Sequence, residues 1–205
     1  MNFLRNLLSA SAAPLPAETV FPEENLLLNV PQGDGYFLTR PGALLKAGRY
    51  KVIRKLGRGS SSSTFLVEDL SPKHGLEYFA VKVLSVSSTI ALREGIIQEL
   101  DVLQVVKDGP WGPGHINPAL PILLDHFALQ GPHGVHYCFV TWTSCSDVGA
   151  FRATAPTGSL SVYIVKPIIC ATVDAVRFLH TRDIIHAGMW LLSVLTPTSS
   201  WLTAV

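Results

Sequence analysis

The sequence predicts an α+β fold, in which an antiparallel sheet of five strands and one helix is followed by a helical part. Apolar stretches of strand length, separated by short turns, occupy residues 50–84 and 120–140. Apolar residues at helical spacing occupy residues 89–107 and 160–180 instead. A run of small residues lies between the first two expected strands, and the third strand carries a single lysine.

Composition limits the functions open to this chain of 205 residues. Apolar residues make up 48 % and charged residues 15 %, and the mean hydropathy is +0.33, which is too apolar for a disordered chain. The net charge of +1 offers no basic surface to nucleic acid. Cys138, Cys145 and Cys170 lack zinc-site spacing, so we expect them to be reduced and buried in a cytoplasmic or nuclear protein.

The two ends of the chain differ from its middle. Residues 1–47 are expected to form a flexible leader, because prolines are spaced through their first 35 positions. Residues 1–17 contain one arginine and no acid; a mitochondrial presequence is the alternative, although such segments are richer in arginine. Residues 184–205 contain no Asp, Glu, Lys or Arg, but Pro197 and the repeated Ser and Thr residues argue against a membrane span.

The strands are expected in two groups. The first group is a meander of three strands, at residues 50–56, 64–70 and 78–84. The second group consists of residues 120–127 and 136–140, which flank a Gly-Pro-His-Gly turn. His133 and His136 at this turn leave a metal site as an alternative. No carboxylate lies close to them in the sequence, and the glycines and the proline favour a plain turn.

Residues 57–62, called the glycine loop below, link the first two expected strands. Gly57 and Gly59 lack Cβ atoms, so the backbone can bend sharply here and bring its N–H groups close to a charged ligand. Ser62 stands at the third position of a G-x-G-x-x-G pattern and is still small. A plain hairpin remains the alternative, because small residues between two strands also form ordinary turns.

Lys82 lies in the middle of an apolar strand, where alternation places it on one face with Ala80 and Leu84. An isolated buried ammonium is costly, so we expect a partner for it. Glu99 lies on an otherwise apolar stripe of the expected helix, at helical spacing from Leu92, Ile96 and Leu103. We therefore expect an ion pair between Lys82 and Glu99, either as part of a site or as a plain structural pair.

A glycine loop, a strand lysine and a helix glutamate in this order resemble the nucleotide-binding lobe of a eukaryotic protein kinase. The strings GRYKVIRKLGRG, STFLVEDL, ILLDHF and HYCFV are similar to those of the SR-protein kinases and their fungal relatives. The resemblance covers residues 48–187. It implies a kinase small lobe at residues 48–144 and an incomplete helical large lobe at residues 145–205.

The resemblance also implies ATP as the ligand. The loop would cover the phosphates, Lys82 would hold phosphate oxygens, and Glu99 would orient the lysine. Thr141 would lie behind the adenine pocket, with the hinge at residues 142–144, where Trp142 replaces the acidic residue usual in the family; an ordinary strand-to-loop exit is the alternative. The residues implied to contact ATP are Leu56, Gly57, Gly59, Ser62, Thr64, Ala80, Lys82, Glu99, Thr141 and Thr143.

The catalytic part of the motif departs from the family. After His186, Gly188 stands at the position of the catalytic aspartate and Ser193 at that of the metal-binding asparagine. Glycine cannot accept the proton of a substrate hydroxyl, and a serine hydroxyl is a poor ligand for the magnesium ion that the family uses. No Asp-Phe-Gly follows in the sequence. We therefore expect a truncated kinase chain without turnover.

Three functions remain open. The first is that of an SR-protein-kinase-like serine/threonine kinase chain, whose family phosphorylates proteins rich in Arg and Ser with ATP, here catalytically inactive. The second is a pseudokinase module that binds ATP, or that binds a partner kinase through an exposed helix face. The third is a decayed or mis-spliced gene product without a function of its own. None of them involves nucleic acid or a membrane.

Overall fold

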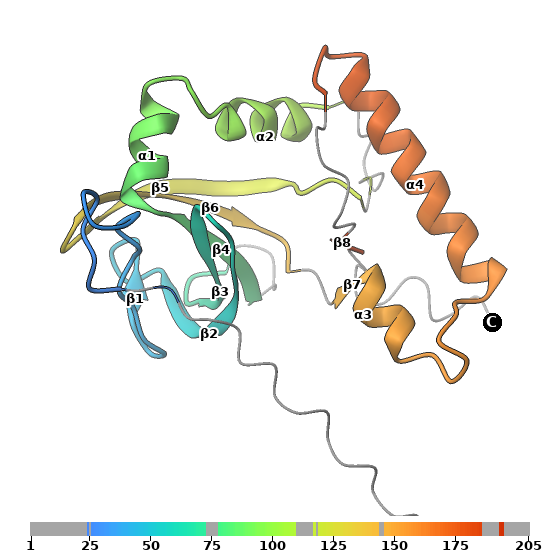
Figure 1. Cartoon of the computed structure of the whole chain (residues 1–205), viewed down its shortest axis with the longest axis horizontal. Helices are drawn as coiled ribbons and strands as arrows, with labels where there is room; N and C mark the ends of the chain where they lie inside the picture. The colour runs from blue at the N-terminus through green and yellow to red at the C-terminus, as the bar shows by residue number, and fades with distance from the viewer. Residues whose placement is uncertain are drawn as a thin grey trace, which may run out of the picture.

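A computed structural model of the chain describes residues 24, 26–72, 78–109, 117, 119–143, 146–185 and 193–194. The helices are α1 (Val86–Arg93), α2 (Glu99–Lys107), α3 (Val148–Ala153) and α4 (Val162–His180). In Figure 1 the sheet lies on one side of the molecule and α4 on the other, with α2 along the top between them. Among the described residues, no helix combines the length and the hydropathy that crossing a bilayer requires.

The main sheet has six antiparallel strands in the order β1-β2-β3-β4-β6-β5. They are β1 (Leu44–Leu45), β2 (Tyr50–Arg58), β3 (Ser62–Asp69), β4 (Tyr78–Leu84), β5 (Leu123–Gly131) and β6 (Gly134–Thr141). The five longer strands are those expected from the sequence, and the two-residue β1 is an addition. Two further short strands, β7 (Ser146–Asp147) and β8 (Ser193–Val194), pair outside this sheet.

The two faces of the sheet carry different residues. Alternation places Phe65 of β3 and Val81 and Val83 of β4 in the main core cluster, on the face that we call the outer face. Lys82 and Phe139 lie directly opposite each other on β4 and β6 and project from the other face, which we call the inner face. The main core therefore lies on the side of the sheet opposite to Lys82.

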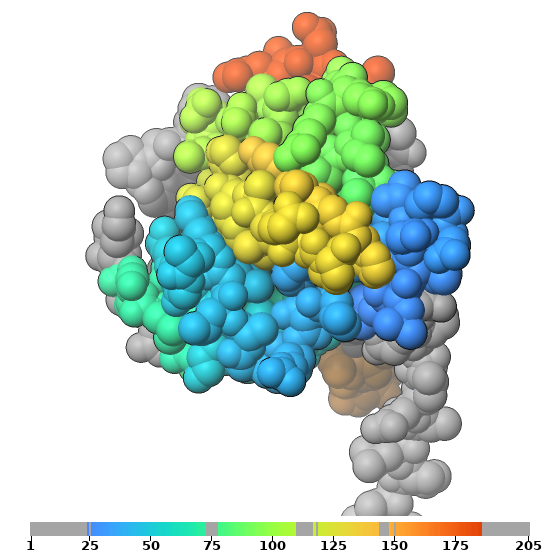
Figure 2. All heavy atoms as spheres, turned by 90° about the vertical axis from the view of Figure 1, so that its left-hand side faces the viewer, coloured from blue at the N-terminus to red at the C-terminus, as the bar shows by residue number. Residues whose placement is uncertain are grey.

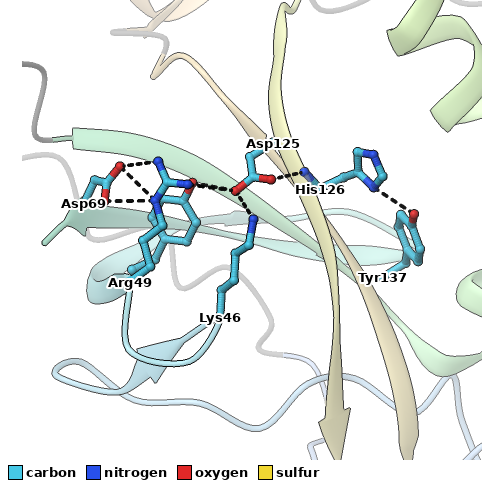
Figure 3. A network of polar contacts seen from close by, with 7 residues as sticks. Lys46, Arg49, Asp69, Asp125, His126 and Tyr137 are labelled. Atoms are coloured by element: carbon cyan, nitrogen blue, oxygen red, sulfur yellow. Dashed lines mark hydrogen bonds and ion pairs between the residues drawn. The ribbon is translucent and has the colours of Figure 1, made fainter. Parts of the chain in front are cut away.

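The sheet curls until strands that are not neighbours touch. The Tyr50 ring of β2 stacks on the Phe127 ring of β5, with 5.8 Å between the ring centroids. The Tyr50 hydroxyl donates a hydrogen bond to Asp125 Oδ2 at 2.8 Å. Asp125 also accepts a hydrogen bond from Lys46 and lies 3.5 Å from Arg49, as Figure 3 shows. These contacts join β2 to β5 across the main core cluster, so the sheet curls around this core like part of a barrel.

The carboxylates of this network are stabilised in their charged form. Burial raises the pKa of the Asp125 carboxyl, but hydrogen bonds from Lys46 and Tyr50 outweigh it and hold the pKa below its ordinary value. Burial likewise acts against ionised Asp69, and its hydrogen bonds with Arg49 and the Ser71 amide lower the pKa of its carboxyl overall. Both aspartates are therefore ionised at neutral pH.

The described part of the expected leader packs against the sheet. Tyr36 is 6 % exposed and Leu45 is 3 % exposed. Phe37 packs on the main core cluster and makes an edge contact with the His136 ring of β6, at 5.0 Å between centroids. In Figure 2 this segment, in dark blue, lies directly beside β5 and β6, in yellow. The folded unit thus begins before residue 48, where the expected leader ends.

Residues 89–107 do not form the single helix that the sequence predicted. The Ser85 side chain caps α1 by accepting a hydrogen bond from the Ser88 amide at 3.2 Å. After α1 the chain turns at Gly95, whose φ of +74° lies in the left-handed region that favours glycine. Ile96, expected on the apolar stripe, follows this turn and is 72 % exposed. The expected stripe therefore does not exist, and α2 is a separate helix.

Helix α4 packs mainly through its C-terminal part. Ala175, Phe178 and Leu179 are buried in a second cluster with Val106 of α2 and Leu120. The rest of α4 leaves several large apolar side chains exposed, namely Val162, Tyr163, Ile164, Ile169 and Val173. This helix matches the one expected at residues 160–180.

Candidate nucleotide-binding site

The glycine loop is the turn between the neighbouring strands β2 and β3. The Gly59 amide donates a hydrogen bond to Ser62 O at 2.8 Å and closes the turn. A Cβ added at Gly57 would meet nothing within 4 Å, and one added at Gly59 would meet only Ser62. Strand β2 also has a register irregularity between Lys55 and Gly57, and such bulges bend a strand locally. The loop thus has open space beside its backbone.

Cross-strand pairing lines up the expected site residues on the inner face. Gly57 lies opposite Thr64, and Thr64 lies opposite Lys82. In the neighbouring row, Ala80 lies opposite Thr141. Directly opposite residues project from the same face, and so do residues two apart on one strand. The end of β2 therefore shares one surface with Lys82 and with the small side chains of Thr64, Ala80 and Thr141. That surface faces away from the main core.

Lys82 and Glu99 meet, as the sequence predicted. The distance between Lys82 Nζ and Glu99 Oε1 is 2.5 Å, and the two side chains are 34 % and 30 % exposed. Glu99 is the first residue of α2, where the helix dipole favours a carboxylate. An ion pair as open as this contributes about 0–1 kcal/mol to stability, so its main effect is to orient the ammonium.

The expected hinge follows β6. The Trp142 ring lies 5.7 Å from the Phe79 ring, so the side chain packs on the sheet. Its indole nitrogen is buried and has no hydrogen-bond partner within the part of the chain that the structure describes. Thr141 and Thr143 are partly exposed, and Leu56, at the end of β2, is 37 % exposed. Ser144 lies outside the described residues.

The remnants of the catalytic motif lie mostly outside the described residues, which include neither His186 nor Gly188. Of Ser193 the backbone is described, and it pairs with Asp147 in the β7–β8 ladder. No three His, Cys, Asp or Glu side chains within the described ranges could hold a metal ion together. The residues present fit the phosphates of a nucleotide through the loop and Lys82. Within the described ranges, they include no cluster of three His, Cys, Asp or Glu side chains that could serve as ligands for magnesium.

His133 and His136 each bond to a backbone carbonyl. His136 is fully buried, its Nδ1 lies 2.9 Å from Leu84 O, and burial lowers the pKa of its imidazole. His133 Nε2 lies 2.8 Å from Leu26 O. Both side chains thus fasten the β5–β6 hairpin to other segments. Among the cysteines, Cys138 is buried as expected, whereas Cys170 is exposed on α4, which corrects the expectation that all three are buried.

No protein-family model matches the chain. SRSF protein kinase 3 of Mus musculus is 32 % identical to it over 157 residues, which are 76 % of this chain and 26 % of that protein. Protein kinase dsk1 of Schizosaccharomyces pombe is 32 % identical over 159 residues, which are 76 % of this chain and 28 % of that kinase. The chain belongs to the protein kinase family and is SR-protein-kinase-like.

The fold agrees with this assignment. The crystal structure of a kinase domain matches this kinase chain with a TM-score of 0.61 at 18 % identity, covering 78 % of this chain and 44 % of that one. A further relative, the serine/threonine-protein kinase SRPK of Physarum polycephalum, is 28 % identical over 76 % of this chain and 35 % of its own length. The kinase chain thus spans about a third or less of the curated relatives it matches.

In this kinase chain, the expected leader makes contacts to the glycine loop that were not predicted from the sequence. Glu24 and Tyr36 both reach the loop or the strands beside it. The available signal was the Asp34-Gly35 pair, a turn former placed directly before the aromatic residues Tyr36 and Phe37. A turn followed by aromatic residues argues for packing rather than for a flexible leader.

Proposed function

We propose that this kinase chain binds ATP on the inner face of its sheet, with the phosphates beneath the glycine loop. The contact between Lys82 Nζ and Glu99 Oε1 at 2.5 Å is the observation that carries the proposal. It holds an ammonium on an open face, on the strand next to the β2–β3 hairpin. The proposed ATP contacts are Leu56, Gly57, Gly59, Ser62, Thr64, Ala80, Lys82, Glu99, Thr141 and Thr143.

Each part of this site has a physical role. Amide N–H groups of the glycine loop and the Lys82 ammonium would neutralise phosphate oxygens. Ala80 and Thr141 lie side by side on the sheet, and small side chains there leave room for a flat base. Backbone groups at residues 141–143 would form hydrogen bonds with the edge of the base. Such contacts do not depend on the side chain at position 142, so Trp142 would be compatible with them. Bound ATP would supply the phosphoryl group of the family's reaction.

We further propose that this chain is catalytically inactive and transfers no measurable phosphate. Gly188 offers no carboxylate at the position of the general base, and such bases contribute about 10²–10⁴-fold to rates. The small lobe at residues 48–144 would then act as an ATP-binding pseudokinase module, and residues 145–205 as part of a large lobe. Proteins rich in Arg and Ser, or a partner kinase, are the proposed partners, in the cytoplasm or nucleus.

The binding proposal is tested by thermal unfolding with ATP and with ADP. A ligand at 100 times its Kd stabilises the folded state by about 2.7 kcal/mol, which raises Tm by several degrees. Lys82→Met should lose this shift, whereas Lys107→Met, a change at the exposed last turn of α2, should keep it. A wild-type chain that is folded and shows no shift with either nucleotide would refute ATP binding.

The catalytic proposal needs a separate assay. Transfer of radiolabelled phosphate from ATP to a peptide rich in Arg and Ser should be undetectable for the wild-type chain, under conditions in which ATP binds. Transfer at the rate of an active kinase would overturn the proposed inactivity and leave the proposed binding site intact. Gly188→Asp measured alongside shows how much of the defect belongs to that position.

A further inference from the structure

The segment before the first long strand lies against both arms of the glycine loop. The Glu24 side chain is 2 % exposed and forms an ion pair with Lys55 of β2. It also accepts a hydrogen bond from Ser63 Oγ of β3 at 2.6 Å. Burial disfavours the charged carboxylate, but the hydrogen bonds from Lys55 and Ser63 outweigh it, so the pKa of Glu24 lies below its ordinary value. A charged group therefore joins β2 to β3 just below the loop.

Tyr36 contacts the tip of the same loop. Its hydroxyl oxygen lies 2.6 Å from Ser60 O and 3.1 Å from Gly59 O. The hydroxyl has one hydrogen, so the shorter contact is the main hydrogen bond and Gly59 O shares it. The Arg58 guanidinium lies over the Tyr36 ring, 5.6 Å from its centroid. Tyr36 therefore contacts three consecutive residues at the end of β2 and the tip of the loop.

The backbone before Tyr36 is itself held in place. Gly35 has a φ of +63°, and an added Cβ would lie 3.3 Å from Val86 side-chain atoms, so a larger residue would be both strained and crowded. Gly35 O accepts a hydrogen bond from the Val86 amide at 2.9 Å, and Asp34 O accepts one from Ser87. The Tyr36 ring is thus supported from the start of α1.

These contacts are made from the outer face of the sheet. Ser63 pairs with Val83, a member of the main core cluster, and Lys55 pairs with Phe65, another member. Arg58 pairs with Ser63 and so projects from the same face. Lys82 projects from the opposite face. The segment therefore does not occupy the proposed nucleotide site but braces the loop from behind.

Because the peptide unit is planar, holding the loop carbonyls in place also fixes the direction of the loop amides. In a trans peptide the C=O of one residue and the N–H of the next point in opposite directions. Because the carbonyls of Gly59 and Ser60 point at Tyr36, the N–H groups of Ser60 and Ser61 point away from it. Among the described residues, neither of these amides donates a hydrogen bond. They are two free donors aimed away from the outer face.

We infer that Tyr36 is a positioning residue for nucleotide binding, which orients the Ser60 and Ser61 amides toward the phosphates by holding the carbonyls behind them. The inference rests on the proposed function, because the phosphates are those of the proposed ATP. It predicts an effect confined to ligands that carry phosphates. Adenosine, which has the base and sugar alone, should not depend on Tyr36.

The test compares Tyr36→Phe with the wild-type chain and with Tyr163→Phe, a matched change at an 89 % exposed tyrosine of α4. Titration calorimetry measures Kd for ADP and for adenosine, and hydrogen exchange in the ligand-free protein follows the Gly59 amide, whose hydrogen bond to Ser62 O closes the loop. Tyr36→Phe should weaken ADP binding and speed loop exchange by roughly 3- to 10-fold, as the loss of one shared hydrogen bond implies. Adenosine binding should stay within about twofold, and Tyr163→Phe should change none of these.

Three results would count against the inference. Unchanged loop exchange in Tyr36→Phe would show that the hydroxyl does not order the loop. Unchanged ADP affinity would show that the ordered amides do not bind phosphate. An equal loss for ADP and adenosine would indicate general damage rather than positioning. If the wild-type chain bound neither ligand, the proposed function would fail, and with it the role in binding, while the exchange data would still decide whether Tyr36 holds the loop.

Discussion

Replacing Asp125 by alanine should weaken the contact between β2 and β5 that keeps the sheet curled, and so destabilise the fold. Asp125 is the acceptor through which β5 holds Tyr50 of β2, together with Lys46 and Arg49 from the turn before β2. Residues 50 and 125 are 75 positions apart, and their strands are not neighbours in the sheet. The Asp125→Ala variant removes this link and also the local hydrogen bond that Asp125 Oδ1 accepts from the His126 amide at 2.9 Å. A double-mutant cycle with Tyr50 therefore has to separate the closing contact from the local one.

The size of the effect follows from the burial of each partner. Tyr50 is 2 % exposed, so its hydroxyl would be left buried without an acceptor, at about 1–3 kcal/mol. The Lys46 and Arg49 side chains are 33 % and 32 % exposed, so each of their ion pairs contributes only about 0–1 kcal/mol. We expect Asp125→Ala to lower the free energy of unfolding by about 2–4 kcal/mol, a large part of a domain's net stability.

Urea unfolding at pH 7, followed by tryptophan fluorescence, measures this change. Asp174→Ala, at an exposed position of α4, is the control and should stay within about 0.5 kcal/mol. Tyr50→Phe, alone and combined with Asp125→Ala, completes a double-mutant cycle, for which we expect a coupling of about 0.5–3 kcal/mol. A loss below about 0.5 kcal/mol, or strict additivity in the cycle, would refute the argument that this contact closes the sheet.

Three further predictions concern the same lobe and α4. The pKa of the Asp69 carboxyl is lower in the folded state than in the unfolded chain, so ionised Asp69 stabilises the fold above about pH 4, and this stabilisation is lost as the pH falls through the folded-state pKa. Asp69→Asn should therefore make the free energy of unfolding, measured by fluorescence, fall less steeply with decreasing pH than it does in the wild-type chain. Gly95→Ala should cost about 1–2 kcal/mol in urea unfolding because of its positive φ, and Gly95→Asn should cost less; equal costs would contradict this reason. Leu179→Ala should cost about 2–5 kcal/mol, whereas Val173→Ala on the exposed side of α4 should cost little; similar losses would contradict the observed packing.

Local patterns accounted for much of the fold. Strand alternation around Lys82 was enough to place it on the face opposite Val81 and Val83, and the structure has it there. The glycine loop joins two neighbouring strands because short loops of small residues strongly favour hairpins. These features depend on residues close together in the chain, and local sequence records them directly.

The pairing of Lys82 with Glu99 was predicted correctly for a partly wrong reason. The prediction placed Glu99 on a continuous helix together with Ile96, whereas the chain breaks at Gly95 and Glu99 begins a new helix. The helical spacing ran across the break in the sequence alone, because Ile96 in the turn is 72 % exposed and does not continue an apolar stripe. Gly95 was the signal for the break in the sequence, but the prediction relied on the apolar spacing instead.

The sequence by itself determined the order of the strands, the small-residue loop and the strand lysine, and with them the resemblance to the kinase family. Only the tertiary structure decided that Tyr50 meets Asp125 and that Tyr36 meets the loop carbonyls of Gly59 and Ser60. Such contacts join residues more than 20 positions apart and depend on how far the sheet curls. Curl is the sum of twist over many residues and their packing, so no single stretch of sequence encodes it.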